Sequence, residues 1–275
     1  MRTTLVLLCL ALLTTTAQAG PWTKSLGAAY LKVSEGLYIA PEYVDPEGVT
    51  RDDVGYLGAS TALYAEVGVG PALHVMLYLP YVLARNAYDN GDNYLSFGGG
   101  DAQIGLQWSP PGLPLPFAVR ADAKIPMYDV TEPGGLEHGF FPARGDGQLD
   151  FTVWLSVGDS LPGLPAYAFV ELGHRFRTET FVGDGTDAEY EDGLVAFAQV
   201  GGRPFGEVNI ALNAGAVMPY TEDAATKGYI TLGPSIFVPV GGGVGLEANY
   251  DATLWARNSS QGHSVGLGVS CSLNP

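Results

Sequence analysis

The chain has 275 residues, of which 38 are glycine and 15 are tyrosine, and only 15% are charged, against roughly 25% in an ordinary soluble domain. Acidic residues outnumber basic ones by 29 to 13, which gives a formal charge of −16. This excess argues against nucleic acid as a partner, because binding to the phosphate backbone requires clustered lysine and arginine.

The first 19 residues predict a signal peptide. Arg2 precedes an apolar run from Leu5 to Leu13, and Ala17-Gln18-Ala19 provides a small-residue cleavage site before Gly20. The apolar run is much shorter than the roughly 20 residues of a membrane-spanning helix. We therefore expect export and cleavage after Ala19, which lowers the formal charge from −16 to −17. Cys271 is then the only cysteine, so the mature chain cannot form an internal disulfide.

The stretch 61–85 shows the clearest secondary-structure pattern. Its apolar residues alternate with glycine, charged and aromatic residues on both sides of Gly70-Pro71, which is the period of a β-strand. Each arm has about the 9 to 11 residues with which a tilted strand crosses a bilayer. One face is aliphatic and the other is mixed, as in a membrane barrel whose apolar face meets lipid. The stretch predicts a transmembrane β-hairpin.

The same alternation predicts that residues 20–275 form an all-β, antiparallel transmembrane β-barrel of about twelve strands. The expected strands are 26–36, 56–69, 72–84, 99–108, 117–127, 147–158, 166–177, 194–203, 207–218, 229–238, 243–256 and 263–273. Short connections rich in proline and glycine alternate with long polar ones, predicted at 37–55, 85–98, 128–146 and 178–193. Outer-membrane barrels have short periplasmic turns and longer extracellular loops. An even strand number then leaves both termini on the periplasmic side, and the predicted location is the bacterial outer membrane.

Strand parity separates apolar from charged side chains. The expected lipid face includes Phe151, Val153, Leu155, Val157, Ile210, Leu212, Ala214, Val244, Leu246, Ala248, Val265, Leu267 and Val269. The opposite face carries a predicted lumen belt of Glu66, Arg120, Asp122, Lys124, Glu171, Arg175 and Glu247. A lipid-facing Arg or Lys costs about 2 to 4 kcal/mol at the bilayer centre, so this segregation favours a barrel. A soluble β-sandwich also places charge outside, and it remains the alternative fold.

Several segments together resemble a known family. They include YAEVGVGPALHVMLYLPY, GGGDAQIGLQW, KIPMYD, GDGQLDFTVWLSVG and AYAFVELGHRFR. In these segments the chain is similar to the outer-membrane barrel family associated with phenol-degradation pathways, the MetA-pathway family. The resemblance covers nearly the whole mature chain. It implies an outer-membrane pore or transporter for small aromatic or hydrophobic compounds, and it brings no catalytic residues.

Catalytic and metal sites find little support. His263, Ser264 and His174 are the candidates for a catalytic site, but His263 and Ser264 are adjacent on a predicted strand, so their side chains point to opposite faces. Polar residues at the membrane interface are the simpler interpretation. The parity of Glu66 and His74 across the turn predicts a lumen hydrogen bond rather than a metal site, which needs about 3 or 4 ligands. We therefore expect no enzyme activity, no cofactor and no metal.

Two loops are rich in acidic oxygen atoms. One contains Asp89, Asp92 and Asn93, and the other contains Asp184, Asp187, Glu189, Glu191 and Asp192. Neither has the spacing of a twelve-residue calcium loop. Solvated acidic loops are the simpler interpretation, and calcium binding stays open.

The sequence thus predicts a narrow outer-membrane pore for small solutes. About twelve strands lie between a filled barrel of 8 and an open channel of 16 to 18. Small residues on the inward face favour an open lumen; they are Gly58, Ser60, Ala62, Gly68, Gly105, Gly215, Gly245, Gly266 and Gly268. The charged belt would narrow the bore and set selectivity. The expected partners are outer-membrane lipid, lipopolysaccharide and a small-molecule solute. The alternative function is a structural or adhesive barrel with a plugged lumen, acting through its acidic loops.

Overall fold

The computed structural model describes residues 20–135, 140–183, 190–221 and 226–274. These residues form one antiparallel sheet that closes on itself through pairing of the first and last strands, from Ala29 opposite Leu273 to Val44 opposite Ser259. The strands are β1 (Ala29–Val44), β2 (Thr50–Arg51), β3 (Val54–Gly70), β4 (Leu73–Tyr88), β5 (Asn93–Gly99), β6 (Asp101–Trp108), β7 (Phe117–Pro126), β8 (Gln148–Ser160), β9 (Ala166–Phe181), β10 (Gly193–Phe205), β11 (Val208–Pro219), β12 (Gly228–Gly241), β13 (Val244–Arg257) and β14 (Ser259–Leu273).

The wall has twelve positions, as predicted. The two-residue β2 lies above the wall beside the end of β1. Strands β5 and β6 together fill one position, because β5 pairs with the upper half of β4 and β6 pairs with the lower half. Gly100 interrupts them, and its N–H donates to the Pro80 carbonyl oxygen at 3.0 Å. The fold class is therefore confirmed, and the β-sandwich alternative is excluded because a closed sheet has no second layer.

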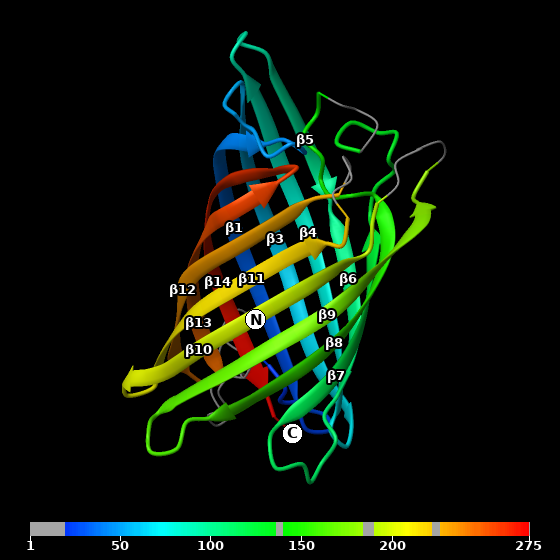
Figure 1. Ribbon diagram of the computed structural model, residues 1–275. Helices are drawn as coiled ribbons and strands as arrows, with labels where there is room; N and C mark the ends of the chain where they lie inside the picture. The colour runs from blue at the N-terminus through cyan, green and yellow to red at the C-terminus, as the bar shows by residue number, and fades with distance from the viewer. Residues whose placement is uncertain (1–19, 136–139, 184–189, 222–225, 275) are drawn as a thin grey trace, which may run out of the picture.

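Several predicted strand ends were wrong. Residues 37–44 and 85–88 continue β1 and β4, and residues 93–98 belong to β5, although the sequence predicted long loops there. On the other side of β1, β14 begins at Ser259 rather than at the predicted residue 263, directly after a turn in which Asn258 has a φ of 46°. Figure 1 shows the β4–β5 hairpin rising above the rest of the wall, with the C-terminus at the other end. Alternation persists in these rising hairpins, but their polar residues and tyrosines obscure it.

The outer surface carries the apolar belt of a membrane barrel. Side chains predicted to face lipid are exposed, including Leu155 at 52%, Leu212 at 46% and Leu267 at 62%. Every wall strand carries exposed aliphatic side chains, and together they mark the surface that contacts the acyl chains of the membrane. Among the described residues no helix is long and apolar enough to cross a membrane.

Glu35 is an exception to this segregation. It is exposed on the outer face of β1, where its neighbours along the strand on that face are Val33 and Leu37. Its sheet partners are Leu267 on β14 and Thr61 on β3. The Thr61 hydroxyl lies 2.8 and 2.9 Å from the two carboxylate oxygens. A carboxylate is thus embedded in the apolar belt with one hydroxyl as its partner.

Candidate functional site: the barrel lumen

The lumen contains two cavities that meet. An extracellular cavity of about 570 Å³ lies along β1, β3, β4, β13 and β14 and is also lined by Gly145 and Arg144 of the connection after β7. A periplasmic cavity of about 480 Å³ lies below it. The two cavities share Lys32, Ser34, Tyr78, Glu247 and Asn249, so they meet at this level.

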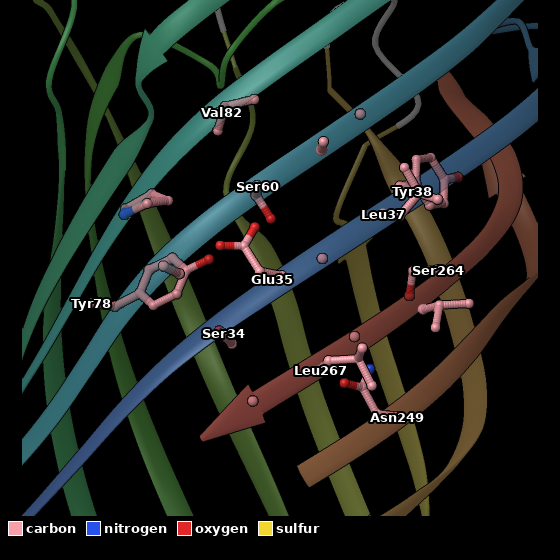
Figure 2. Close-up of a pocket in the computed structure, with 18 of the residues that line it drawn as sticks. Ser34, Glu35, Leu37, Tyr38, Ser60, Tyr78, Val82, Asn249, Ser264 and Leu267 are labelled. Carbon is pink, nitrogen blue, oxygen red and sulfur yellow. The ribbon is translucent and has the colours of Figure 1, made fainter. Parts of the chain in front are cut away.

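Small residues keep the extracellular cavity open. Figure 2 shows Ser34, Ser60 and Tyr78 among its lining residues, on the strands β1, β3 and β4. Gly58, Ser60, Ala62, Gly266 and Gly268 also line it, in agreement with the expectation that inward small residues leave space. Ser264 faces this cavity while the neighbouring His263 Nδ1 lies 2.7 Å from the hydroxyl of the exposed Tyr250. The two residues therefore lie on opposite faces of the wall.

The chain itself fills the periplasmic end. Residues 20–27, here called the N-terminal segment, run inside the barrel below the first strand. The Gln107 side chain donates to the Gly20 carbonyl oxygen at 3.0 Å, and Trp22 packs edge-on against Tyr167 and Phe169 with ring centroids 6.2 and 6.0 Å apart. A β-carbon on Gly68 would lie 1.9 Å from the Ser25 carbonyl oxygen. Gly68, predicted to leave open space, instead accommodates this segment.

Charged residues of the predicted belt form separate clusters rather than one ring. In the periplasmic half, Arg120 lies 3.1 Å from Asp122 and 3.3 Å from Glu171, and its guanidinium lies over the Trp154 ring. The Ser156 hydroxyl also donates to Glu171 at 2.7 Å. Because Arg120 contacts two carboxylates, its charge is neutralised within the wall.

Two further acidic residues of the predicted belt pair with lysines. Glu66 lies 3.3 Å from Lys24 Nζ and accepts from Tyr64 at 2.6 Å. Glu247 lies 3.1 Å from Lys32 Nζ and accepts from the Tyr30 hydroxyl. The predicted hydrogen bond between His74 and Glu66 is replaced by contacts with Lys24, whose backbone N–H donates to His74 Nδ1 at 3.3 Å. The sequence could not show this, since Lys24 reaches both residues only through the inward path of the N-terminal segment.

Lys124 belongs to a second cluster near the extracellular end, centred on Asp146. Asp146 lies 3.0 Å from Arg177, 3.3 Å from Lys124 and 3.5 Å from Lys227. Asp150, only 1% exposed, lies 2.7 Å from Lys124 and 3.1 Å from Arg177. We call these five residues the Asp146 cluster. It joins β7, β8 and β9 to the connections that precede β8 and β12.

The electrostatics of Asp146 follow from this geometry. Burial alone would raise the pKa of its carboxyl group, but the charges of Lys227, Lys124 and Arg177 hold that pKa well below its usual range. Arg175, the remaining residue of the predicted belt, lies in the sheet opposite Thr152 and Gly193 and adds to the positive field at Asp146. The carboxylate therefore stays ionised and holds the extracellular connection in place.

Contacts of Tyr128 and Arg144, beside the Asp146 cluster, order the long connection after β7. The Tyr128 hydroxyl donates to Asp101 at 3.1 Å, and the Gly147 N–H donates to the Tyr128 oxygen at 2.8 Å. Within the same connection Arg144 donates to the Phe97 carbonyl oxygen at 3.4 Å and contacts Tyr128 and Glu132. This connection therefore folds against β5 and β6 and narrows the extracellular mouth.

His174 lies outside the lumen. Its ring contacts the Tyr220 hydroxyl at 2.7 Å and Asp192 at 3.3 Å, and it packs against Phe176, which is 46% exposed on the outer face. No group of three potential metal ligands is present in residues 20–135, 140–183, 190–221 and 226–274. Asp184, Asp187 and Glu189 of the second acidic loop lie outside these residues, as does the predicted signal peptide.

A closed β-barrel with an apolar outer belt and a polar lumen defines a transmembrane barrel of the outer-membrane type. Comparison with solved structures agrees with this class. The chain is similar to the COG4313 outer membrane channel from Pseudomonas putida F1, with 10% identity, a TM-score of 0.74, and coverage of 94% of this chain and 100% of that one.

Two further barrels are similar at a lower level. They are the translocator domain of the autotransporter NalP from Neisseria meningitidis, at 12% identity, a TM-score of 0.55 and coverage of 90% of this chain and 89% of that one, and the CymD monoaromatic hydrocarbon channel, at 9% identity, a TM-score of 0.51 and coverage of 92% and 90%. No protein-family model and no curated protein matches the sequence. At these identities the likeness is one of fold, which is the fold of bacterial outer-membrane channels, and it agrees with the location predicted from the sequence.

Proposed function

We propose that the protein is an outer-membrane pore through which small solutes pass, and that small aromatic or hydrophobic compounds are among them. The observation that carries this proposal is the pair of contiguous cavities inside the closed barrel, of about 570 and 480 Å³. Tyr30, Phe197 and Phe237 line the periplasmic cavity and offer aromatic surface to a solute. The name of the similar CymD channel supports the same class of solute.

The charged side chains supply a selectivity element in this proposal. Arg120 with its two carboxylates and Lys32 with Glu247 would narrow the route between β1, β7 and β13. The N-terminal segment narrows it further at the periplasmic end. We also propose that a signal peptide at residues 1–19 directs export and is cleaved. The extracellular rim of the barrel would contact lipopolysaccharide.

The protein acts without catalysis in this account. His174 and His263 each face outward and contact a tyrosine hydroxyl at 2.7 Å, whereas Ser264 lines the extracellular cavity. This separation supports polar interfacial roles for the histidines, because a nucleophile and its base must lie within hydrogen-bond reach.

A plugged structural or adhesive barrel is the second candidate, and the N-terminal segment inside the lumen favours it. Conductance in planar bilayers separates the two. We expect the mature chain to form discrete low-conductance channels, and a variant without residues 20–27 to form larger ones. If neither protein conducts after refolding to a heat-modifiable barrel, the pore proposal fails and the plugged barrel stands.

A further inference from the structure

An uncharged chain of hydrogen bonds crosses one wall of the periplasmic cavity. Asn209 Nδ2 donates to the Tyr167 oxygen at 3.0 Å, and the Tyr167 hydroxyl donates to Gln199 Oε1 at 2.7 Å. Gln199 Nε2 donates to Asn213 Oδ1 at 2.5 Å, and Asn213 Nδ2 donates to Ser235 Oγ at 3.0 Å. We call these five residues the amide ladder. They come from β9, β10, β11 and β12, and all five line the cavity of about 480 Å³.

The amide ladder retains spare hydrogen-bonding capacity. One amide hydrogen of Gln199 and the hydroxyl hydrogen of Ser235 are not used within the ladder, and the carbonyl oxygens of Gln199 and Asn213 each accept only one ladder bond. The ladder thus presents donors and acceptors side by side. A hydroxyl group matches such a surface because it donates and accepts at the same atom.

The opposite wall of this cavity carries two lysine–carboxylate pairs, and the carboxylate of Asp251, which accepts a hydrogen bond from Asn249 at 3.0 Å, also lines the cavity. Lys24 lies 3.3 Å from Glu66, and Lys32 lies 3.1 Å from Glu247. An ion that enters the cavity loses part of its hydration, and the paired lysines and carboxylates offer it little compensation. An uncharged solute avoids that cost and can exchange its water hydrogen bonds for those of the ladder.

We propose that the amide ladder recognises uncharged solutes that carry hydroxyl groups, and that it favours their passage over solutes without donor hydrogens. This proposal rests on the proposed pore function and names the class of solute. Phe197 and Phe237, which line the same cavity, pack against the carbon skeleton while the ladder binds the hydroxyl groups.

Osmotic swelling of proteoliposomes that contain the full mature chain tests the proposal. The two probes are erythritol, an uncharged tetrol, and trimethylamine N-oxide, which has no net charge and no donor hydrogen. The ladder variant is Asn213→Leu, which replaces an amide by an apolar group of similar size. Asn249→Leu is the matched control, because Asn249 lines the same cavity from β13 and bonds to Asp251 rather than to the ladder. Each variant is first checked for the gel shift of a folded barrel, and Gln199→Met replaces Asn213→Leu if that variant does not fold.

The readout is the ratio of erythritol to trimethylamine N-oxide influx. We expect the ladder variant to lower this ratio at least threefold and the control variant to leave it within a factor of about 1.5. An unchanged ratio in the ladder variant, or an equal fall in the control, would overturn the recognition role while leaving the pore intact. Failure of the wild-type protein to pass either probe would overturn the pore itself and this proposal with it.

Discussion

Glu35 offers a direct test of the membrane orientation, because the structure places its carboxylate in the lipid-facing belt. Replacement by leucine removes a charge whose cost on the lipid face is below the ~2 to 4 kcal/mol of a basic residue, and roughly 1 to 2 kcal/mol is a fair estimate. It also adds an apolar side chain beside Val33, Leu37 and Leu267. The added apolar surface contributes roughly 1 kcal/mol, and the lost hydrogen bond from Thr61 offsets about the same amount. We expect Glu35→Leu to stabilise the barrel by about 1 to 2 kcal/mol.

Urea unfolding of the chain from lipid vesicles, followed by tryptophan fluorescence, measures this change. Glu35→Gln removes the charge and keeps an acceptor for Thr61, so it should give roughly half the gain. Thr61→Val should destabilise the wild type by about 0.5 to 1.5 kcal/mol but have little effect in the Glu35→Leu background. If Glu35→Leu destabilised the barrel by more than about 1 kcal/mol, Glu35 would have a partner other than lipid and Thr61, and the orientation of β1 would be in question.

Three further predictions concern the lumen. The pKa of the Asp146 carboxyl group lies below its value in the unfolded chain, so its contribution to stability is complete above about pH 4 and is lost as the pH falls further. The difference in unfolding free energy between wild type and Asp146→Asn should therefore be constant from pH 8 to 5 and shrink below pH 4. A difference that grows on acidification would contradict this. Gly68→Val should displace the N-terminal segment, because a β-carbon there would lie 1.9 Å from the Ser25 carbonyl oxygen, and the expected result is a larger single-channel conductance; an unchanged conductance would count against closure by this segment. Replacing Arg120 and Lys124 together by glutamine should shift the reversal potential towards cation selectivity, and an unchanged potential would refute a role of these two residues in selectivity.

The sequence was informative about the wall because period-two alternation reports directly on the two environments of a barrel strand. Leu155, Leu212 and Leu267 lie outside as expected, and Arg120 and Glu171 lie inside. The twelve wall positions followed from the same pattern. Strand ends were less predictable, since β1 and the β4–β5 hairpin continue beyond the apolar belt, where polar residues and tyrosines remove the contrast between faces.

The arrangement inside the lumen depends on contacts that parity does not contain. Parity placed Arg120 and Lys124 on one face of β7, but not in separate clusters that involve Glu171 in one case and Asp146 in the other. Asp146 is the last residue of the connection predicted at 128–146, and no role was predicted for it. The sequence around it holds one basic residue, Arg144, and only the fold brings Arg177 and Lys227 to its carboxylate.

Three features of the structure were not predicted from the sequence. The path of residues 20–27 into the lumen has no periodic signal, although Trp22 and Lys24 in a short segment before the first strand hinted at inward contacts. Glu35 follows the lipid-facing parity of Val33 and Leu37, so the alternation places it outside, but charged residues were expected only on the lumen face. The amide ladder was missed because asparagine and glutamine carry no charge.

The central claim is that solutes pass through the lumen, and thiol modification of a lumen residue tests it most directly. Ser60 lines the extracellular cavity, so Ser60→Cys, made in a Cys271→Ser background, places one reactive group on the proposed route. We predict that a small charged thiol reagent added to the extracellular side of a planar bilayer lowers the single-channel current of this variant in one step. The same reagent should leave a Val33→Cys control, whose thiol faces lipid, unaffected. If mass spectrometry shows complete modification of Ser60→Cys and its single-channel current is unchanged, passage through this lumen is contradicted.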